Sequence, residues 1–273
     1  AFIRLTAQLG GTSGRHAEHI DDDFRPNKES FLAVLSSAMY NASQEFETGG
    51  FDPVFARECV ERMNELAEET EDESLLPDTQ VYNAPLRWTG GSVLWAESRP
   101  YARYSPWQDY QQLLSKGLRE EVEDGDLRVK EAKDMEAWLN SMEEESASNP
   151  RIAPNIETYE AVIQGWLRTR ARLGLERAEA VLHRVLSSSE ESTRPRLQTF
   201  HPIIATLLHS KDDSHGPKIM EWVDKWLDVE TESGNRITVP DGRILELQMS
   251  ARVHTQSKLL EDLTKSEEPD KIK

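Results

Sequence analysis

The chain has 273 residues, enough for one large domain or two modest ones, and 37% of them are hydrophobic. Its net charge of −18 creates a field that repels nucleic-acid phosphates unless a local basic patch overrides it, so DNA is not an expected partner. The single cysteine, Cys59, excludes an internal disulfide and a zinc site built on paired cysteines. No apolar run approaches the roughly 20 residues that span a bilayer, so a soluble or peripheral protein is expected.

Residues 1–23 are predicted to form a flexible N-terminal segment, because it contains Gly10, Gly11 and Gly14. These glycines lack the Lys-Ser/Thr ending of a phosphate-binding loop. His16 and His19, together with the aspartates at 21–23, could be drawn as a metal cluster, but a flexible acidic terminus is the preferred interpretation. No metal or cofactor is therefore predicted. A start at Ala1 in place of Met suggests a processed terminus, and a removed transit peptide is one interpretation.

Four ten-residue segments share one pattern: a proline, four variable or small residues, an aromatic residue, three further residues, and then Leu or Ile. The copies begin at Pro26, Pro77, Pro154 and Pro195, with a weaker fifth copy at Pro240. The proline ends the preceding element, and residues four apart share one face of a helix. Each segment therefore predicts a helix start with one buried pair: Phe31 with Leu35, Tyr82 with Leu86, Tyr159 with Ile163, and Phe200 with Ile204.

A second helical pattern follows each start and begins with a small residue, after which apolar residues recur three, four or seven positions later. The small residues are Ala56, Ala132, Ala178 and Gly216. A small residue lets two helices approach closely, as a tight helical hairpin requires. The prediction is an all-α fold, an α-solenoid of about four to five helix-turn-helix repeats over residues 24–257, with insertions.

Acidic segments follow the first three of these second helices, and each is predicted to be a solvated turn. They lie at residues 68–73, 143–145 and 190–191. The densest basic stretch has Arg168, Arg170, Arg172 and Arg177 and is broken by Glu176. A solvated helix surface is preferred there over a track for RNA. Four tryptophans, Trp138, Trp166, Trp222 and Trp226, are predicted core residues, and the charged tail at residues 258–273 is expected to fray.

The largest insertion spans about residues 87–126 and holds six of the twenty aromatic residues. They are Trp88, Trp95, Tyr101, Tyr104, Trp107 and Tyr110. The insertion either folds back onto its own solenoid or forms a platform on which a partner docks, since Trp and Tyr dominate interface hot spots. Both interpretations remain open.

Two of the helix starts, Pro77-Asp78 with Val81-Tyr82-Asn83 and Pro154-Asn155 with Thr158-Tyr159, resemble the pentatricopeptide-repeat family. The segment 178–186 is similar to the family's second helix. The resemblance covers roughly two thirds of the chain, chiefly residues 26–227 outside the insertion. It implies an α-solenoid of a mitochondrion or plastid, and most such proteins bind single-stranded RNA with one base per repeat.

The resemblance also implies that two residues per repeat read each base: the one after the aromatic residue and the one after the next repeat's proline. The resulting pairs are Leu32 with Asp78, Asn83 with Asn155, Glu160 with Arg196, and His201 with Asp241. Only Asn83 with Asn155 fits the family's usual choices, so these two are the candidate RNA-reading residues. One readable base cannot specify a sequence.

No pattern indicates catalysis, because the histidines are scattered and no Ser or Cys lies in a nucleophile elbow. The chain is therefore predicted to be no enzyme. The acidic charge, the degenerate reading pairs and the aromatic insertion favour a structural or adaptor subunit of a large organellar assembly, which binds other protein subunits. The alternative is an organellar single-stranded-RNA-binding factor in RNA processing, stability or translation, associated with a ribosome in one version.

Overall fold

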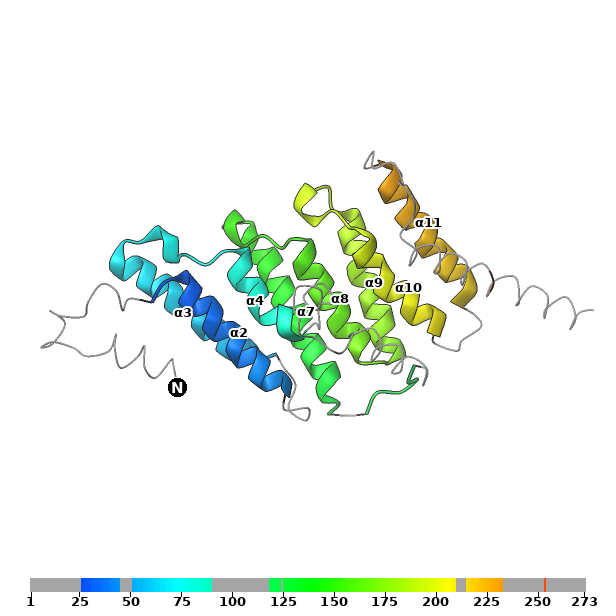
Figure 1. The fold of residues 1–273 in the computed structure, drawn as a ribbon, viewed down its shortest axis with the longest axis horizontal. Helices are drawn as coiled ribbons and strands as arrows, with labels where there is room; N and C mark the ends of the chain where they lie inside the picture. The colour runs from blue at the N-terminus through cyan, green and yellow to red at the C-terminus, as the bar shows by residue number, and fades with distance from the viewer. Residues whose placement is uncertain are drawn as a thin grey trace, which may run out of the picture. The chain divides into compact units, whose positions relative to one another are not determined.

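A computed structural model describes residues 26–44, 51–89, 118–123, 125–209, 215–232 and Val253. The regular structure within these ranges is helical (Figure 1), with one isolated backbone bridge between Arg119 and Ala171. This part of the chain confirms the all-α prediction. Its α-helices are α2 (Lys28–Gln44), α3 (Pro53–Thr70), α4 (Thr79–Thr89), α7 (Leu127–Ser146), α8 (Ile156–Arg168), α9 (Arg172–Ser187), α10 (Leu197–His209) and α11 (Gly216–Glu232). Short 3-10 turns are η3 (Glu73–Leu75), η4 (Pro150–Ile152) and η5 (Glu191–Thr193).

The four predicted helix starts are confirmed, and each helix begins two residues after its proline, at Lys28, Thr79, Ile156 and Leu197. Side-chain caps explain these starts. Asn155 Oδ1 accepts from the Thr158 backbone N–H at 3.2 Å, and Thr158 Oγ1 accepts from the Asn155 N–H at 3.1 Å. This reciprocal capping box satisfies two backbone donors that the helix leaves unpaired. Thr199 Oγ1 accepts from the Arg196 N–H at 3.1 Å in the same way.

The predicted apolar faces are also confirmed. All eight residues of the aromatic-aliphatic pairs are buried, as are the four small residues that begin the second-helix patterns. The four tryptophans at 138, 166, 222 and 226 are at most 4% exposed and belong to the core. Burial of such side chains is the main favourable contribution to folding. No helix of the described ranges has the length and apolar character needed to cross a membrane.

Two compact units divide the chain. Unit 1 comprises residues 1–89 and 140–153, and unit 2 comprises residues 90–139 and 154–273, so α7 contributes its last residues to unit 1. In unit 1, α2 packs against α3 and α4 (Figure 1). Thr79 Oγ1 donates to the backbone oxygens of Arg151 and Ala153 at 3.0 and 2.8 Å, which fixes the start of α4 against η4.

Unit 2 contains two helical hairpins, α8 with α9 and α10 with α11, and α10 also packs against α8 and α9. Two glycines of the first hairpin make close contacts, Gly174 with the turn before α9 and Gly165 with Met135 of α7. A Cβ at Gly174 would lie 2.1 Å from Thr169 Oγ1, and a Cβ at Gly165 would lie 2.7 Å from Met135 Sδ. The small residue Ala178 is buried as well.

The acidic turn predicted at residues 143–145 is wrong, because α7 continues to Ser146 and includes all three glutamates. Glutamate favours helix, so the acidic run extends the helix. The chain turns only after it, where Ser148 Oγ donates to the Glu145 oxygen at 3.0 Å and the Asn149 N–H donates to the same oxygen. Residues 68–70 are likewise the last turn of α3, and residues 190–191 lead into η5 as expected.

Candidate functional site

The six aromatic residues predicted as a docking platform lie almost wholly outside the described residues. Trp88 belongs to the last turn of α4. Trp95, Tyr101, Tyr104, Trp107 and Tyr110 lie between the described ranges 51–89 and 118–123. The platform therefore stays a prediction.

The two candidate RNA-reading residues have structural environments of their own. Asn83 lies in α4 of unit 1 and is 1% exposed. Asn155 is the N-cap of α8 in unit 2, where its Oδ1 accepts from the backbone and hydroxyl of Thr158. A base at either position would have to compete with packing around Asn83 or with the cap at Asn155.

Another expected reading pair, Glu160 with Arg196, is brought together within unit 2. Arg196 Nε and Nη2 donate to the two carboxylate oxygens of Glu160 at 3.2 and 3.1 Å. Thr199 Oγ1 adds a bond of 2.7 Å to Glu160 Oε1. Glu160 is 5% exposed, so this is a buried carboxylate held by a bidentate guanidinium and a hydroxyl. The group ties α8 to the first turn of α10.

A related ion pair lies at the start of α4 in unit 1. Asp78, the residue that follows Pro77, pairs with Lys28 Nζ from the first turn of α2. Asp78 Oδ1 also accepts from the backbone N–H groups of Gln80 and Val81, at 3.1 and 3.2 Å. Asp78, which the resemblance makes a base-reading residue, therefore caps the N-terminus of α4 and pairs with the ammonium group of Lys28.

Two buried glutamates that sequence reasoning missed connect successive second helices. Glu136 of α7 accepts from Trp166 Nε1 at 2.8 Å and from Arg177 of α9 at 2.5 and 3.2 Å. Glu179 of α9 accepts from Trp222 Nε1 at 2.8 Å and from Lys218 Nζ at 2.5 Å, both of α11. Each carboxylate thus receives one indole N–H and at least one cation, and Glu136 also pairs with Arg184 at 3.7 Å.

The sequence contained a signal for these connections. Arg177 follows Glu136 by 41 residues, and Lys218 follows Glu179 by 39 residues, close to the repeat length. The indoles also carry cations on their faces, since Arg177 Cζ lies 5.8 Å from the Trp166 ring centre. Each buried indole ring thus packs in the core while its N–H group donates a hydrogen bond to a carboxylate.

The basic stretch was expected on the surface of one helix. In the structure it crosses the turn between α8 and α9. Arg177 binds Glu136, whereas Arg172 pairs with Glu120 and Glu176 at 3.5 and 3.3 Å. Arg168 is the last residue of α8, and Arg170 lies in the turn with a φ of 51°. Arg172 and Arg177 are both exposed, as a solvated surface requires, although the charge of Arg177 also meets the buried carboxylate of Glu136.

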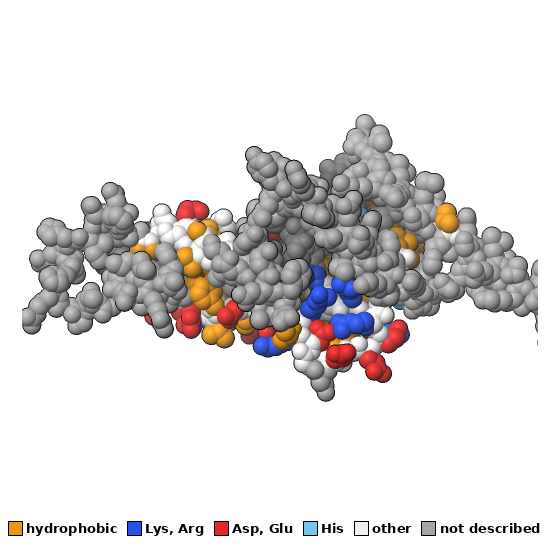
Figure 2. Space-filling view, turned by 60° about the horizontal axis from the view of Figure 1, so that its bottom comes forward, with side chains coloured by type: hydrophobic (Ala, Val, Ile, Leu, Met, Phe, Trp, Pro, Cys, Tyr) orange, Lys and Arg blue, Asp and Glu red, His pale blue; other side chains and the backbone are white. Residues whose placement is uncertain are grey.

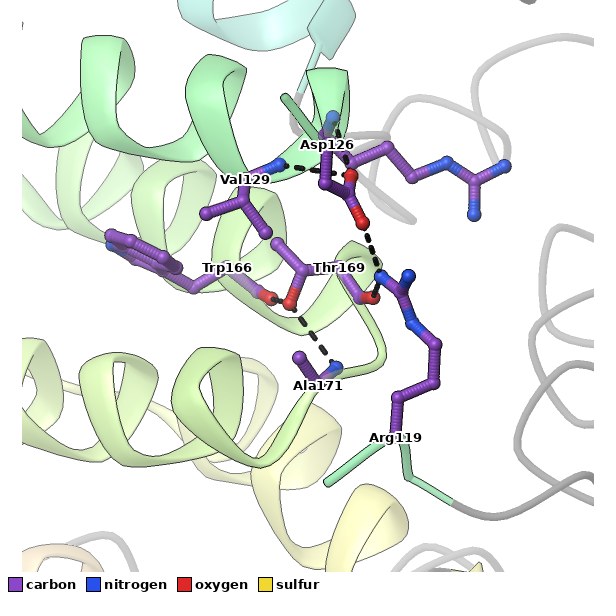
Figure 3. A network of polar contacts seen from close by, with 7 residues as sticks. Arg119, Asp126, Val129, Trp166, Thr169 and Ala171 are labelled. Carbon is purple, nitrogen blue, oxygen red and sulfur yellow. Dashed lines mark hydrogen bonds and ion pairs between the residues drawn. The ribbon is translucent and has the colours of Figure 1, made fainter. Parts of the chain in front are cut away.

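A segment far away in sequence lies against this turn. The Arg119 N–H donates to the Arg170 oxygen at 2.8 Å, and the Arg172 N–H donates to the Arg119 oxygen at 3.0 Å. The Arg119 Nη2 group donates to the Thr169 oxygen and to Asp126 Oδ2, both at 2.6 Å (Figure 3). Although burial raises the pKa of Asp126, the hydrogen bond and charge of Arg119 hold it below its ordinary value.

Three further guanidiniums, those of Arg128, Arg168 and Arg170, gather here and are called the arginine cluster below. Lost hydration lowers the pKa of Arg168. The charge of Glu131 opposes this shift, and the charge of Arg128 adds to it. Lost hydration and the charges of Arg128 and Arg119 lower the pKa of Arg170. Among the described residues no side-chain hydrogen bond or ion pair satisfies the arginine cluster. Figure 2 shows Lys and Arg side chains gathered on one face, with acidic side chains at the margin.

Cys59, the single cysteine of the chain, is buried. Burial, and then the charge of Glu58, raises the pKa of the Cys59 thiol to about 12, so the thiolate nucleophile scarcely forms at neutral pH. No group of three or more His, Cys, Asp and Glu side chains suited to a metal ion occurs in these ranges. The histidines and aspartates at positions 16–23 lie outside them.

Comparison with known proteins leaves the chain without an assigned family. No protein-family model matches it, and no curated protein matches it either.

Proposed function

We propose that this chain is a non-enzymatic helical-repeat protein that acts as a structural or adaptor subunit of a large organellar assembly through protein–protein contacts. Its architecture in this proposal is an α-solenoid of the pentatricopeptide type. The observation that carries the proposal is the closed pair of Glu160 and Arg196, because these residues occupy positions at which the family resemblance expects base reading.

Base reading requires side chains that can offer hydrogen bonds to a nucleotide. Glu160 is buried and already accepts from Arg196 twice and from Thr199 once. Opening this group for a base would leave a buried charge without its partners, which costs several kcal/mol (about 3–5) in comparable cases. The carboxylate would also repel RNA phosphates. A contact that ties α8 to α10 is therefore better explained as part of a scaffold.

The repeat architecture is supported by features that recur. Each of the four helix starts follows its proline by two residues, and hydroxyl caps recur at Ser30, Thr158 and Thr199. The buried glutamates connect α7 to α9 and α9 to α11 with similar residue spacing. In repeat proteins such nearest-neighbour contacts supply much of the stability, and the stacked helices offer an extended surface to partners.

The alternative, an organellar RNA-binding factor, is tested by titrating fluorescently labelled single-stranded RNA of mixed sequence with the purified chain. The expected result is no tight binding at about 0.1 M salt, because the net charge is −18. Tight binding that weakens steeply with added salt would refute the adaptor proposal and support the RNA-binding factor.

The control for this titration is Glu160→Gln, which weakens the pair with Arg196 and frees a cation beside α10. If the wild-type chain reads bases at this position, the variant changes the affinity for RNA. If the pair is structural, both proteins remain without tight binding, and only the stability of the variant falls.

A further inference from the structure

The arginine cluster is unusual in a chain that has 50 acidic and 32 basic residues, because carboxylates are abundant. Several other arginines form an ion pair with a carboxylate. Arg62 binds Glu65 at 2.7 Å, and Arg119 binds Asp126 at 2.6 Å. In the cluster, Glu131 faces Arg168, but Arg128 acts on both Arg168 and Arg170 as a like charge, and the two charges that act on Arg170 are both positive.

This arrangement destabilises the protein when nothing is bound. Like charges repel, and buried polar atoms without a hydrogen bond cost free energy. Arg170 Nε is buried and has no partner among the described residues. Arg170 also adopts a φ of 51°, a left-handed conformation that residues other than Gly and Asn rarely adopt. An anion at this place would remove the repulsion and satisfy guanidinium donors.

The surrounding backbone holds the cluster in place. Arg168 ends α8, Arg170 lies in the turn, and Arg128 lies in the first turn of α7. Arg119 fixes the turn through two backbone hydrogen bonds and a side-chain bond to the Thr169 oxygen (Figure 3). The end of α8 with the turn that follows it and the start of α7 thus present guanidiniums together, and planar guanidiniums suit the bidentate binding of carboxylates.

Carboxylates border the cluster. Glu120 and Glu176 both pair with Arg172 beside the turn, and Glu121 and Glu123 are exposed on the segment that follows Arg119. A long polyanion that continued past the cluster would meet these negative charges, whereas a short anionic segment would not. The charge pattern therefore favours a brief acidic stretch over an extended nucleic-acid strand.

We propose that the arginine cluster is the docking site for a short acidic segment of a partner protein. The inference rests on the proposed adaptor function and names the chemistry of the partner surface. Carboxylates of the segment would bind Arg128 and Arg168, and the flanking glutamates would limit its length.

The test is a fluorescence anisotropy titration of the purified full chain with a short Asp/Glu-rich peptide. A peptide with Asn and Gln at the same positions is the neutral control probe. The cluster variant is Arg128→Gln with Arg168→Gln. The matched control variant, Arg57→Gln with Arg62→Gln, removes two positive charges from α3. Arg168→Gln alone repeats the test with one charge removed from the end of α8.

The acidic peptide is expected to bind the wild-type chain, and the neutral peptide is not. The cluster variant should weaken binding by about tenfold or more, and the control variant by less than about twofold. Loss of repulsion should leave the urea midpoint of the cluster variant equal or higher, which distinguishes lost binding from lost structure. Absent binding of the acidic peptide, or equal binding by the cluster variant, overturns the inference.

The single-stranded RNA titration, run on the same proteins, separates this failure from failure of the proposed function. If neither probe binds, the docking inference is wrong and the adaptor proposal stands. If RNA binds more tightly than the peptide and the cluster variant abolishes that binding, the anion is a nucleic acid and both proposals are wrong.

Discussion

Two glycines of the α8–α9 hairpin should respond differently to the same substitution, glycine to alanine. Both lie in helices, where alanine is favoured over glycine by about 0.5–1 kcal/mol. At Gly174 the new Cβ would lie 2.1 Å from Thr169 Oγ1 and 2.4 Å from the backbone oxygen of Trp166. At Gly165 it would lie 2.7 Å from Met135 Sδ and 3.1 Å from Met135 Cε.

The magnitudes follow from what must move. Met135 meets the new methyl group with the end of a flexible side chain, so a rotamer adjustment of about 0.5–1.5 kcal/mol roughly cancels the helix gain. The Trp166 oxygen belongs to the backbone and already accepts from Thr169 Oγ1 at 2.7 Å. Overpacking against such a fixed group costs typically 1–3 kcal/mol, occasionally more. We expect Gly174→Ala to lose about 2 kcal/mol and Gly165→Ala to remain within about 0.5 kcal/mol of wild type.

Urea denaturation followed by far-UV circular dichroism measures both variants against the wild-type chain. The expected result is a lower midpoint for Gly174→Ala alone, with an unchanged slope. Equal midpoints for the two variants would refute the reasoning, because the turn between α8 and α9 could not then be as tight as the structure has it.

Three further substitutions or reactions test other features. Glu136→Leu leaves the Trp166 indole N–H and the Arg177 guanidinium without their acceptor. It should lower the free energy of unfolding by about 1–3 kcal/mol, which is more than Glu136→Gln should. Urea midpoints equal to wild type would contradict this. Glu71→Gly should raise the urea midpoint slightly, by the equivalent of about 0.5–1 kcal/mol, since Glu71 caps α3 with a φ of 54°; a lower midpoint would disprove the strain. Cys59 should react with a thiol reagent at about pH 8 only as fast as the protein unfolds, because burial raises its pKa to about 12, and rapid labelling without denaturant would contradict its burial. The folded-state pKa of Cys59 exceeds the ordinary thiol value of 9.0, so its contribution to stability is complete below about pH 9 and is lost as the pH rises toward 12.

Local patterns in the sequence predicted the helices well. The proline and the aromatic-aliphatic spacing act within one turn or two, so the starts of α2, α4, α8 and α10 and their buried pairs could be predicted. The same local logic failed at the end of α7, where Glu143 to Glu145 were expected in a turn although glutamate favours helix.

The polar connections between helices were harder to predict from the sequence, because each joins residues about 40 positions apart. The spacing of 41 residues between Glu136 and Arg177 is close to the repeat length, but only the structure shows that the two side chains meet. Glu160 with Arg196 was expected as a pair only because the family resemblance aligned their positions, and its closed ion pair required the structure. The arginine cluster depends on Arg128, which lies 40 residues before Arg168 and was not part of the basic stretch seen in the sequence.

The adaptor proposal is tested most directly by sedimentation of the native protein from an extract of the cells that produce it, with and without RNase. Co-sedimentation with a large protein assembly that survives RNase is the predicted result. Release after RNase of a free species near 31.2 kDa would contradict the proposal, because the protein would then be held in the particle by RNA.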